Sequence, residues 1–198
     1  MPYILRPMSG RSGRTDEPQS ALDVAAALLE VRPGLDQMQL HKLLYLVQAA
    51  HLAWFGSRAY GEAIEAWIYG PVTRQVAGHY MQFGDLPITR VGVGSPARLP
   101  ERLRWLIAQV AERFGGMDGF KLAELVKEPG SPWRQARGDL ADDAPSDAEI
   151  RPDVIADYHR RFGFGETSDP TPRQNELAQR FFDGDTDALA ELFGATVL

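Results

Sequence analysis

The sequence predicts a mainly α-helical fold: a compact helical domain with a small β-hairpin or extended element. Apolar residues recur at spacings of three and four over residues 36–56 and again over 100–115, the pattern of helices that bury one face. Between these stretches, residues 63–68 form a short run rich in aromatic and β-branched side chains, which favours a strand. With 198 residues, 44% of them hydrophobic, the chain can enclose one core of ordinary size.

Two helices are predicted in the first part of the chain. Ser20 and Asp23 resemble a capping box that opens a short helix, and the Pro-Gly pair at 33–34 ends it. The second helix begins near Asp36, and Gly56 suits its C-terminal cap because glycine readily adopts left-handed backbone angles. The apolar positions expected to face the core on this second helix are Leu40, Leu43, Leu44, Val47, Ala50 and Trp54.

The extended element is expected at residues 63–68. Gly70 and Pro71 end this strand, because proline has no N–H for a β-ladder. Pro71 is also expected to be the first residue of a helix that runs to Met81. Residues 88–93 are a second candidate strand, which would pair with the first.

The rest of the chain is predicted to be helical, in one domain with two flanking segments. Four helices are expected: between Pro100 and Gly115, over residues 119–126, from Pro132 onward, and from about Asp147 to Phe162. The predicted organisation is a disordered N-terminal segment at 1–18, a helical domain at 19–163 and a C-terminal helical tail at 164–198.

Composition excludes several classes of protein. The chain has no cysteine, which excludes disulfides, thiolate catalysis and cysteine-ligated zinc. A formal net charge of −6 and a pI near 5.2 argue against a protein that binds duplex DNA. No apolar run reaches the roughly 18 to 20 residues of a membrane span, and residues 1–14 lack the features of a secretory signal. We expect a soluble, cytoplasmic protein whose partner is neither a membrane nor a nucleic acid.

The four histidines do not form a metal-binding pattern. His41 and His51 lie ten residues apart on one predicted helix, not one turn apart, and His79 and His159 lie on other helices. We therefore expect no metal, no cofactor and no catalytic residue.

Glu62 and Glu65 raise the question of general acid–base catalysis, which needs two carboxyl groups in one cleft. Three residues apart in a strand, they would lie on opposite faces. The preferred interpretation of Glu65 is a structural ion pair with Lys42.

Aromatic side chains near the turns are candidates for contact with a protein partner. Tyr69 and Trp133 adjoin turn-forming residues, so they are expected to be exposed anchors. Gly70 and Pro71 lack the glycine-rich run of a phosphate loop and are interpreted as a sharp structural turn.

Several blocks of sequence, in this order, resemble the Panacea domain family. That family comprises phage-associated proteins of the SocA and GepA type, many of them antitoxins. The blocks are Leu40-His41-Lys42-Leu43-Leu44-Tyr45, Trp54-Phe55-Gly56, Glu65-Ala66-Trp67-Ile68-Tyr69-Gly70-Pro71-Val72, Leu122 to Trp133 with Ser131-Pro132-Trp133, and Ile150 to Tyr158. The resemblance covers about residues 20–162. Its motif residues with an expected structural role are Leu40, Lys42, Leu43, Tyr45 and Glu65.

Two positions depart from the family pattern. His41 stands where the family usually has glutamine, and Val126-Lys127 replace a Thr-His pair that commonly precedes the Pro-Trp motif. The missing histidine favours a non-enzymatic interpretation.

The resemblance implies one half of a toxin–antitoxin pair: a helical domain that neutralises a cognate protein toxin by direct protein–protein binding. A related role in the family is that of an adaptor that delivers the toxin to an ATP-dependent protease. The candidate toxin-binding residues are Trp67, Tyr69, Gly70, Pro71 and Trp133.

Two alternatives stay open at this point. One is a phage-associated metal-dependent hydrolase or nuclease that uses scattered histidines and glutamates, among them His79. The other is a DNA-binding regulator in which residues 36–55 form part of a helix-turn-helix pair, although the acidic pI counts against it.

Overall fold

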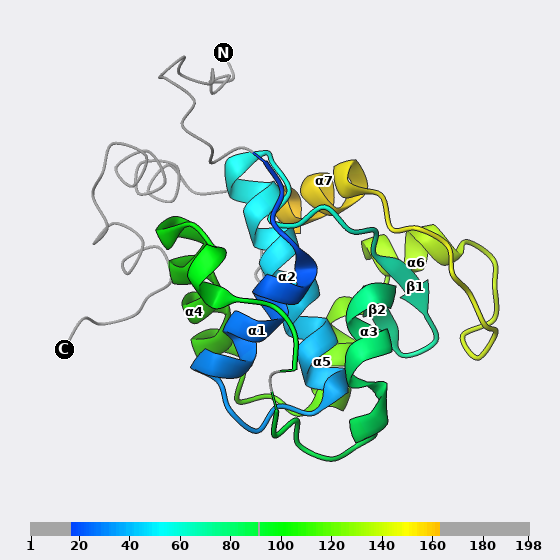
Figure 1. Cartoon of the computed structure of the whole chain (residues 1–198). Coiled ribbons are helices and arrows are strands. Elements are labelled where there is room, and N and C mark those ends of the chain that lie inside the picture. The colour runs from blue at the N-terminus through cyan, green and yellow to red at the C-terminus, as the bar shows by residue number, and fades with distance from the viewer. Residues whose placement is uncertain (1–16, 91, 163–198) are drawn as a thin grey trace, which may run out of the picture.

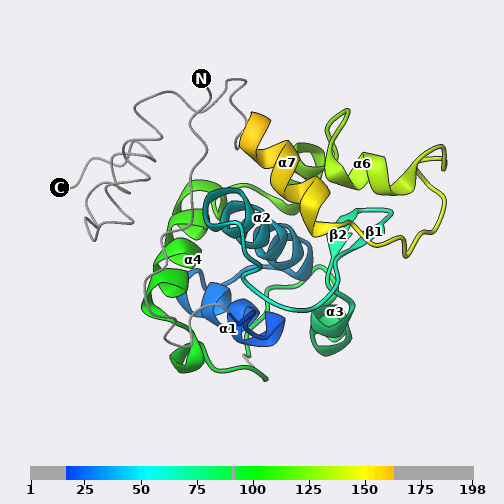
Figure 2. The same cartoon turned by 90° about the horizontal axis from the view of Figure 1, so that it is seen from above.

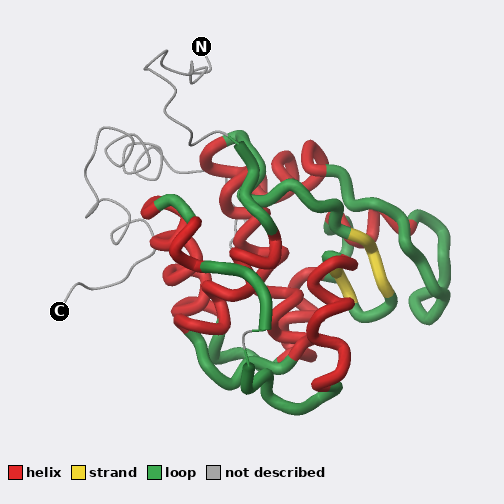
Figure 3. The backbone as a smooth tube through the Cα atoms, in the orientation of Figure 1, coloured by secondary structure: helices red, strands yellow, loops and turns green. Residues whose placement is uncertain are grey.

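A computed structural model describes residues 17–90 and 92–162 of the chain, and within them the fold is mainly helical with one small hairpin (Figure 1). Figure 3 shows helices over most of this part, and within it the short strands pair into one two-stranded sheet. The predicted fold class is confirmed. The α-helices are α1 (Ala21–Val31), α2 (Gln37–Phe55), α3 (Arg74–Tyr80), α4 (Glu101–Phe114), α5 (Gly119–Val126), α6 (Pro132–Arg137) and α7 (Pro152–Phe162), with short 3-10 helices η1 (Met81–Phe83) and η2 (Pro96–Arg98).

Helix α2 is the centre of the fold. It packs against α1, α3, α4, α5, α7 and strand β2 (Gly70–Val72), and Figure 2 shows it between α1, α4, α7 and the hairpin. Every residue from Leu40 to Ala50 is buried, so this stretch has no solvent-facing side. Its start is fixed by a capping box, in which Asp36 accepts from the Gln39 backbone and the Gln39 side chain accepts from the Asp36 backbone. Gly56 ends it with a φ of +69°, as predicted.

The hairpin differs from the prediction. Strand β1 (Glu65–Trp67) pairs antiparallel with β2, and Ala66 lies opposite Pro71. Pro71 is thus a strand residue and not the start of a helix, since α3 begins only after Thr73. A two-stranded sheet tolerates proline because each strand is an edge.

The prediction of a second strand at 88–93 is wrong. Ile88 is buried and its N–H donates to the carbonyl of Leu35 at 2.8 Å, which ties this segment to the α1–α2 connection and not to β1. Residue 91 lies outside the described part of the chain.

Two helix starts also need correction. Ser20 caps α1 without Asp23, because the Asp23 carboxylate accepts from the Ser95 backbone at 2.6 Å and is not part of a capping box. Helix α7 begins at Pro152 and not near Asp147, since the residues before it run beside the hairpin: the Ala66 N–H donates to the carbonyl of Ala148 at 2.9 Å. The helices predicted from Pro100, over 119–126 and from Pro132 are confirmed.

The predicted disordered segment at 1–18, apart from Glu17 and Pro18, and the predicted tail at 164–198 lie outside the described residues. Across residues 17–90 and 92–162, every helix is too short or too polar to cross a bilayer.

Candidate functional site

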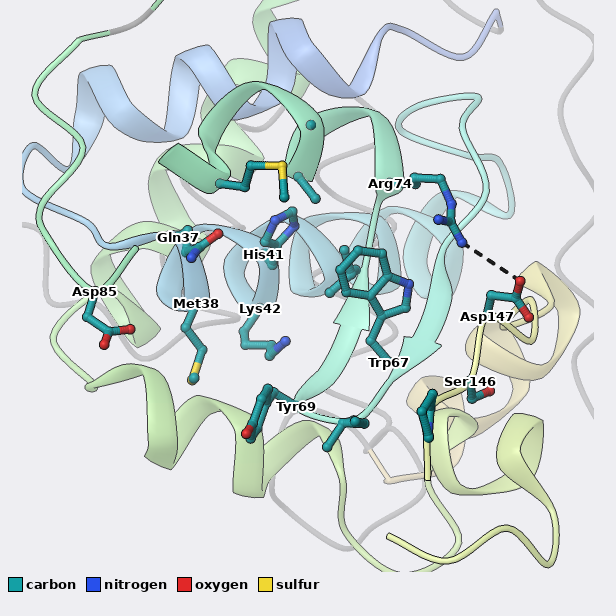
Figure 4. Close-up of a pocket in the computed structure, with 16 residues that line it drawn as sticks. Gln37, Met38, His41, Lys42, Trp67, Tyr69, Arg74, Asp85, Ser146 and Asp147 are labelled. Atoms are coloured by element: carbon teal, nitrogen blue, oxygen red, sulfur yellow. Dashed lines mark ion pairs between the residues drawn. The ribbon is translucent and has the colours of Figure 1, made fainter. Parts of the chain in front are cut away.

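A groove of about 990 Å³ opens between the hairpin, the first turns of α2, the α3 segment and the loop before α7 (Figure 4). Apolar side chains form most of its wall. The residues that line it are Gln37, Met38, His41, Lys42, Trp67, Ile68, Tyr69, Val72, Arg74, Ala77, Gly78, Met81, Asp85, Pro145, Ser146 and Asp147. The groove therefore unites the two blocks of sequence around residues 40–45 and 65–72, which lie side by side in the fold.

His41 forms part of the floor of this groove. Figure 4 shows its ring projecting from α2 between Gln37 and Trp67. The residue is 5% exposed, and within the described residues neither ring nitrogen has a hydrogen-bond partner. Burial, and then the neighbouring charge of Lys42, lower the pKa of His41 to about 3. The ring is therefore neutral at physiological pH, with one N–H donor and one bare nitrogen acceptor.

Lys42 lies beneath the hairpin turn. Its side chain is 1% exposed, and its Nζ donates to the carbonyl of Pro71 at 3.1 Å. Burial, and then the charge of Lys127, lower the pKa of Lys42 to about 7. The prediction of an ion pair between Lys42 and Glu65 is wrong, because the Glu65 carboxylate pairs with a different cation.

That cation is Arg74, at the first turn of α3. Its Nε and Nη2 donate to the two carboxylate oxygens of Glu65 at 2.9 and 2.6 Å, and the Trp67 indole N–H donates to the same carboxylate at 2.7 Å. Burial opposes ionisation of Glu65, but these hydrogen bonds outweigh it and lower its pKa. Figure 4 shows Arg74 also directed at Asp147, at 3.9 Å, so one guanidinium joins the hairpin to the loop before α7.

Glu62 lies apart from Glu65 and has a structural role. Its carboxylate accepts from the Ala21 backbone at 2.9 Å and from the Ser20 hydroxyl at 3.2 Å, at the start of α1. The two glutamates therefore do not share a cleft, and they cannot act together as an acid–base pair.

The turn of the hairpin presents one candidate anchor and buries two neighbours. Tyr69 is 64% exposed, as predicted, whereas Gly70 and Pro71 are buried. Gly70 has a φ of +108°, and a Cβ at this position would lie 2.9 Å from Cε of Lys42. Only glycine fits both the backbone angle and the space above Lys42.

Trp133 is not the exposed anchor that its position beside a turn predicted. It is fully buried, and its indole N–H donates to the carbonyl of Trp67 at 2.7 Å. Cations of Lys127, Arg134 and Arg137 lie 4.6 to 4.9 Å from its ring centre. Trp133 thus supports the hairpin from below.

The other motif residues lie in the core. Leu40, Leu43 and Tyr45 are buried on α2, and the Tyr45 hydroxyl is hydrogen-bonded to Nε2 of His159 on α7 at 3.0 Å. Nδ1 of His51 is hydrogen-bonded to the carbonyl of Ser57 at 2.7 Å. Among the described residues, no three histidine or acidic side chains gather at a spacing that would hold a metal ion.

Three parts of the groove have no signal in the sequence pattern. Nothing distinguishes Arg74 from the other surface arginines before α3 is placed beside β1, and the loop 145–147 reads as a linker. Met81 completes the wall only because α3 folds back over α2. The apolar spacing gives no signal for His41 either, because neighbouring positions on a helix do not share a face and His41 is not one of the core-facing positions.

Comparison with known families places this site in context. Residues 40–134 match the family model described as "Antitoxin SocA-like, Panacea domain". No curated protein and no solved structure matches the chain. The matched range includes α2 from Leu40 onward, the hairpin and most of the groove wall, and it ends just after Trp133. The match to the SocA-like Panacea domain family therefore belongs to residues 40–134, just under half of the chain.

Proposed function

We propose that this protein is a cytoplasmic antitoxin that neutralises a cognate protein toxin by direct binding, and that the groove and its Tyr69 rim are the contact surface. The family of the matched segment supports the antitoxin role. The groove supports the location, because it combines an apolar surface with an exposed tyrosine and most of its lining residues belong to that segment.

The exposed side chains at this groove are of the kind that dominate binding energy. Tyr69 and Met81, at 64% and 65% exposed, stand on its rim, and half-buried Trp67 forms its wall. Tyrosine and tryptophan are enriched among residues whose truncation weakens a complex most. Gly70, Pro71 and Trp133 are assigned a positioning role in this proposal, because they hold the turn but expose no side chain.

A binding role is favoured over catalysis by what the polar groups already do. The Glu65 carboxylate is engaged by Arg74 and Trp67, and the Lys42 amine by the Pro71 carbonyl. His41 is neutral and lies beside no carboxylate that could orient it as a base in the part of the chain described here.

The experiment is co-expression with the product of the adjacent gene. We expect that product to arrest growth when expressed alone and to co-purify with this chain when growth is restored. Tyr69→Ser should weaken the complex at least tenfold, which corresponds to about 1.4 kcal/mol. Phe120→Ser is the matched control, because Phe120 is 72% exposed but does not line the groove. A harmless gene product, or a complex that survives Tyr69→Ser unchanged, contradicts the proposal.

Delivery of the toxin to an ATP-dependent protease is a separable part of this proposal. An adaptor shortens the lifetime of the toxin in cells, whereas an antitoxin that only occludes its partner leaves that lifetime unchanged or longer. Pulse-chase labelling of the toxin, with and without this chain and in cells lacking the protease, distinguishes the two mechanisms.

A further inference from the structure

The unusual feature of the groove is a buried imidazole that has no partner. His41 is 5% exposed, lines the groove and has no hydrogen bond at either ring nitrogen within the described residues. Neighbouring atoms cover both nitrogens, so a ligand reaches them only when side chains of the wall move aside. A buried polar group without a partner lowers the equilibrium constant for folding by about five- to 150-fold. A ligand that supplies a partner for this ring recovers part of that cost on binding.

The charges around the groove favour a neutral ligand at its floor. Arg74 is already paired with Glu65 and lies near Asp147, and the Lys42 amine already donates to Pro71. A charged group would have to lose its water beside a neutral ring and apolar walls, and burial in the same surroundings already lowers the pKa of the neighbouring Lys42 to about 7, so this part of the groove disfavours charge. The ligand group at His41 is therefore polar but uncharged.

The walls specify what carries this polar group. Trp67, Met38 and Met81 line the groove together with His41. Indole rings and thioethers both form favourable contacts with an aromatic ring, and methionine side chains re-pack easily around an inserted group. A hydroxyl matches the imidazole in either tautomer, because it donates to a bare nitrogen or accepts from an N–H.

We propose that the groove is a tyrosine-binding subsite: a tyrosine of the partner inserts its ring between Trp67 and the methionines and hydrogen-bonds to His41 through its hydroxyl. This inference rests on the proposed function for the identity of the partner. The subsite itself is a property of this chain and is testable without the toxin.

The first test uses p-cresol, which is the tyrosine side chain as a free molecule, on full-length ¹⁵N-labelled protein. Toluene lacks the hydroxyl, and propionamide offers a carboxamide in its place. We expect p-cresol to shift the resonances of Trp67 and of one ring nitrogen of His41, and to bind at least tenfold more tightly than toluene or propionamide.

Two matched variants complete this test. His41→Leu should bind p-cresol and toluene equally, whereas His79→Leu, an exposed histidine on α3 outside the groove, should keep the preference. Equal binding of p-cresol and toluene by the unaltered protein overturns the proposal. So does tighter binding of propionamide, or a His41 resonance that p-cresol does not move. The resonance measurement needs no variant, so misfolding of His41→Leu does not remove the test.

The second test uses the complex. Each tyrosine of the toxin is changed to phenylalanine, and one of these changes should weaken binding tenfold or more with this protein but less than twofold with His41→Leu. If p-cresol binds as expected but no toxin forms a complex, the proposed function fails and the subsite stands. If the toxin binds but p-cresol does not, the subsite fails and the proposed function stands.

Discussion

Replacing Lys42 by methionine should remove a rise in stability between pH 7.5 and 9.5. The pKa of Lys42 is about 7 in the folded protein, against 10.5 for an unperturbed lysine. The unfolded chain therefore binds more protons than the folded chain between these two pH values, and the free energy of unfolding increases with pH across this range. Above it the full stability is present, and as the pH falls towards 7 that stability is lost.

The size of the effect follows from the two pKa values. Linkage with these values gives an increase of about 2.5 kcal/mol in the free energy of unfolding from pH 7.5 to 9.5. Burial raises the pKa values of Tyr45 and Tyr60, so both hydroxyls stay protonated in the folded protein. They lower the free energy of unfolding only where tyrosine in the unfolded chain ionises, near pH 10, which is above this window. Methionine has a similar volume and no charge, so Lys42→Met should be nearly flat across the window.

The assay is urea denaturation at several pH values, followed by circular dichroism. Lys121→Met is the matched control, because Lys121 is exposed on α5 and should leave the pH dependence intact. At pH 7.5 the variant should also be more stable than the unaltered protein, because it has no lysine to deprotonate on folding. This gain is reduced by about 1–3 kcal/mol, because the carbonyl of Pro71 loses its donor. The reasoning is refuted if Lys42→Met keeps the slope, or if the unaltered protein has none.

Two further predictions concern the support of the hairpin turn. Gly70→Ala should destabilise the protein by about 2–4 kcal/mol, because the new Cβ would press on Lys42 in addition to the cost of a positive φ. The control is Gly34→Ala, at φ +88° in open space, which should lose only the stability that the backbone angle costs. Equal losses in the two variants would contradict the steric explanation. Trp133→Phe should cost about 2 kcal/mol in urea denaturation, because it removes the donor to the Trp67 carbonyl and weakens the contacts with three cations, and a loss below 0.5 kcal/mol would contradict this.

The sequence predicted those elements whose signals are local. Helix α2 could be predicted from the sequence because its apolar spacing, its cap at Asp36 and its glycine at 56 agree with one another. Helix α4 was readable for the same reason, since its apolar stripe runs from Leu103 to Phe114 and Gly115 follows.

The hairpin was only half readable, because its strands have three residues each and depend on tertiary contacts. The rule that proline ends a strand failed at Pro71, where the neighbouring strand makes no demand on its missing N–H and Lys42 supplies a donor for its carbonyl. The pairing of Glu65 was likewise not local, since Arg74 reaches it only after the chain has turned from β2 into α3.

The site itself shows the same division. Tyr69 was identified as exposed because an aromatic beside a turn has few ways to be buried, but the same argument failed for Trp133. A pocket for that indole is built from Lys127, Arg137 and the Trp67 carbonyl, which come from three separate segments. The sequence of one segment alone therefore cannot predict that Trp133 is buried.

The central position of α2 has a practical consequence for dissection of this protein. The family match spans residues 40–134, yet α1 and α7 lie outside it and both pack directly on α2. A fragment cut at the match boundaries would begin inside α2, beyond its Asp36 cap, and would leave Tyr45 without its bond to His159. Expression trials that aim at a minimal soluble unit should therefore retain at least residues 17–162, and shorter pieces should aggregate through the uncovered faces of this helix.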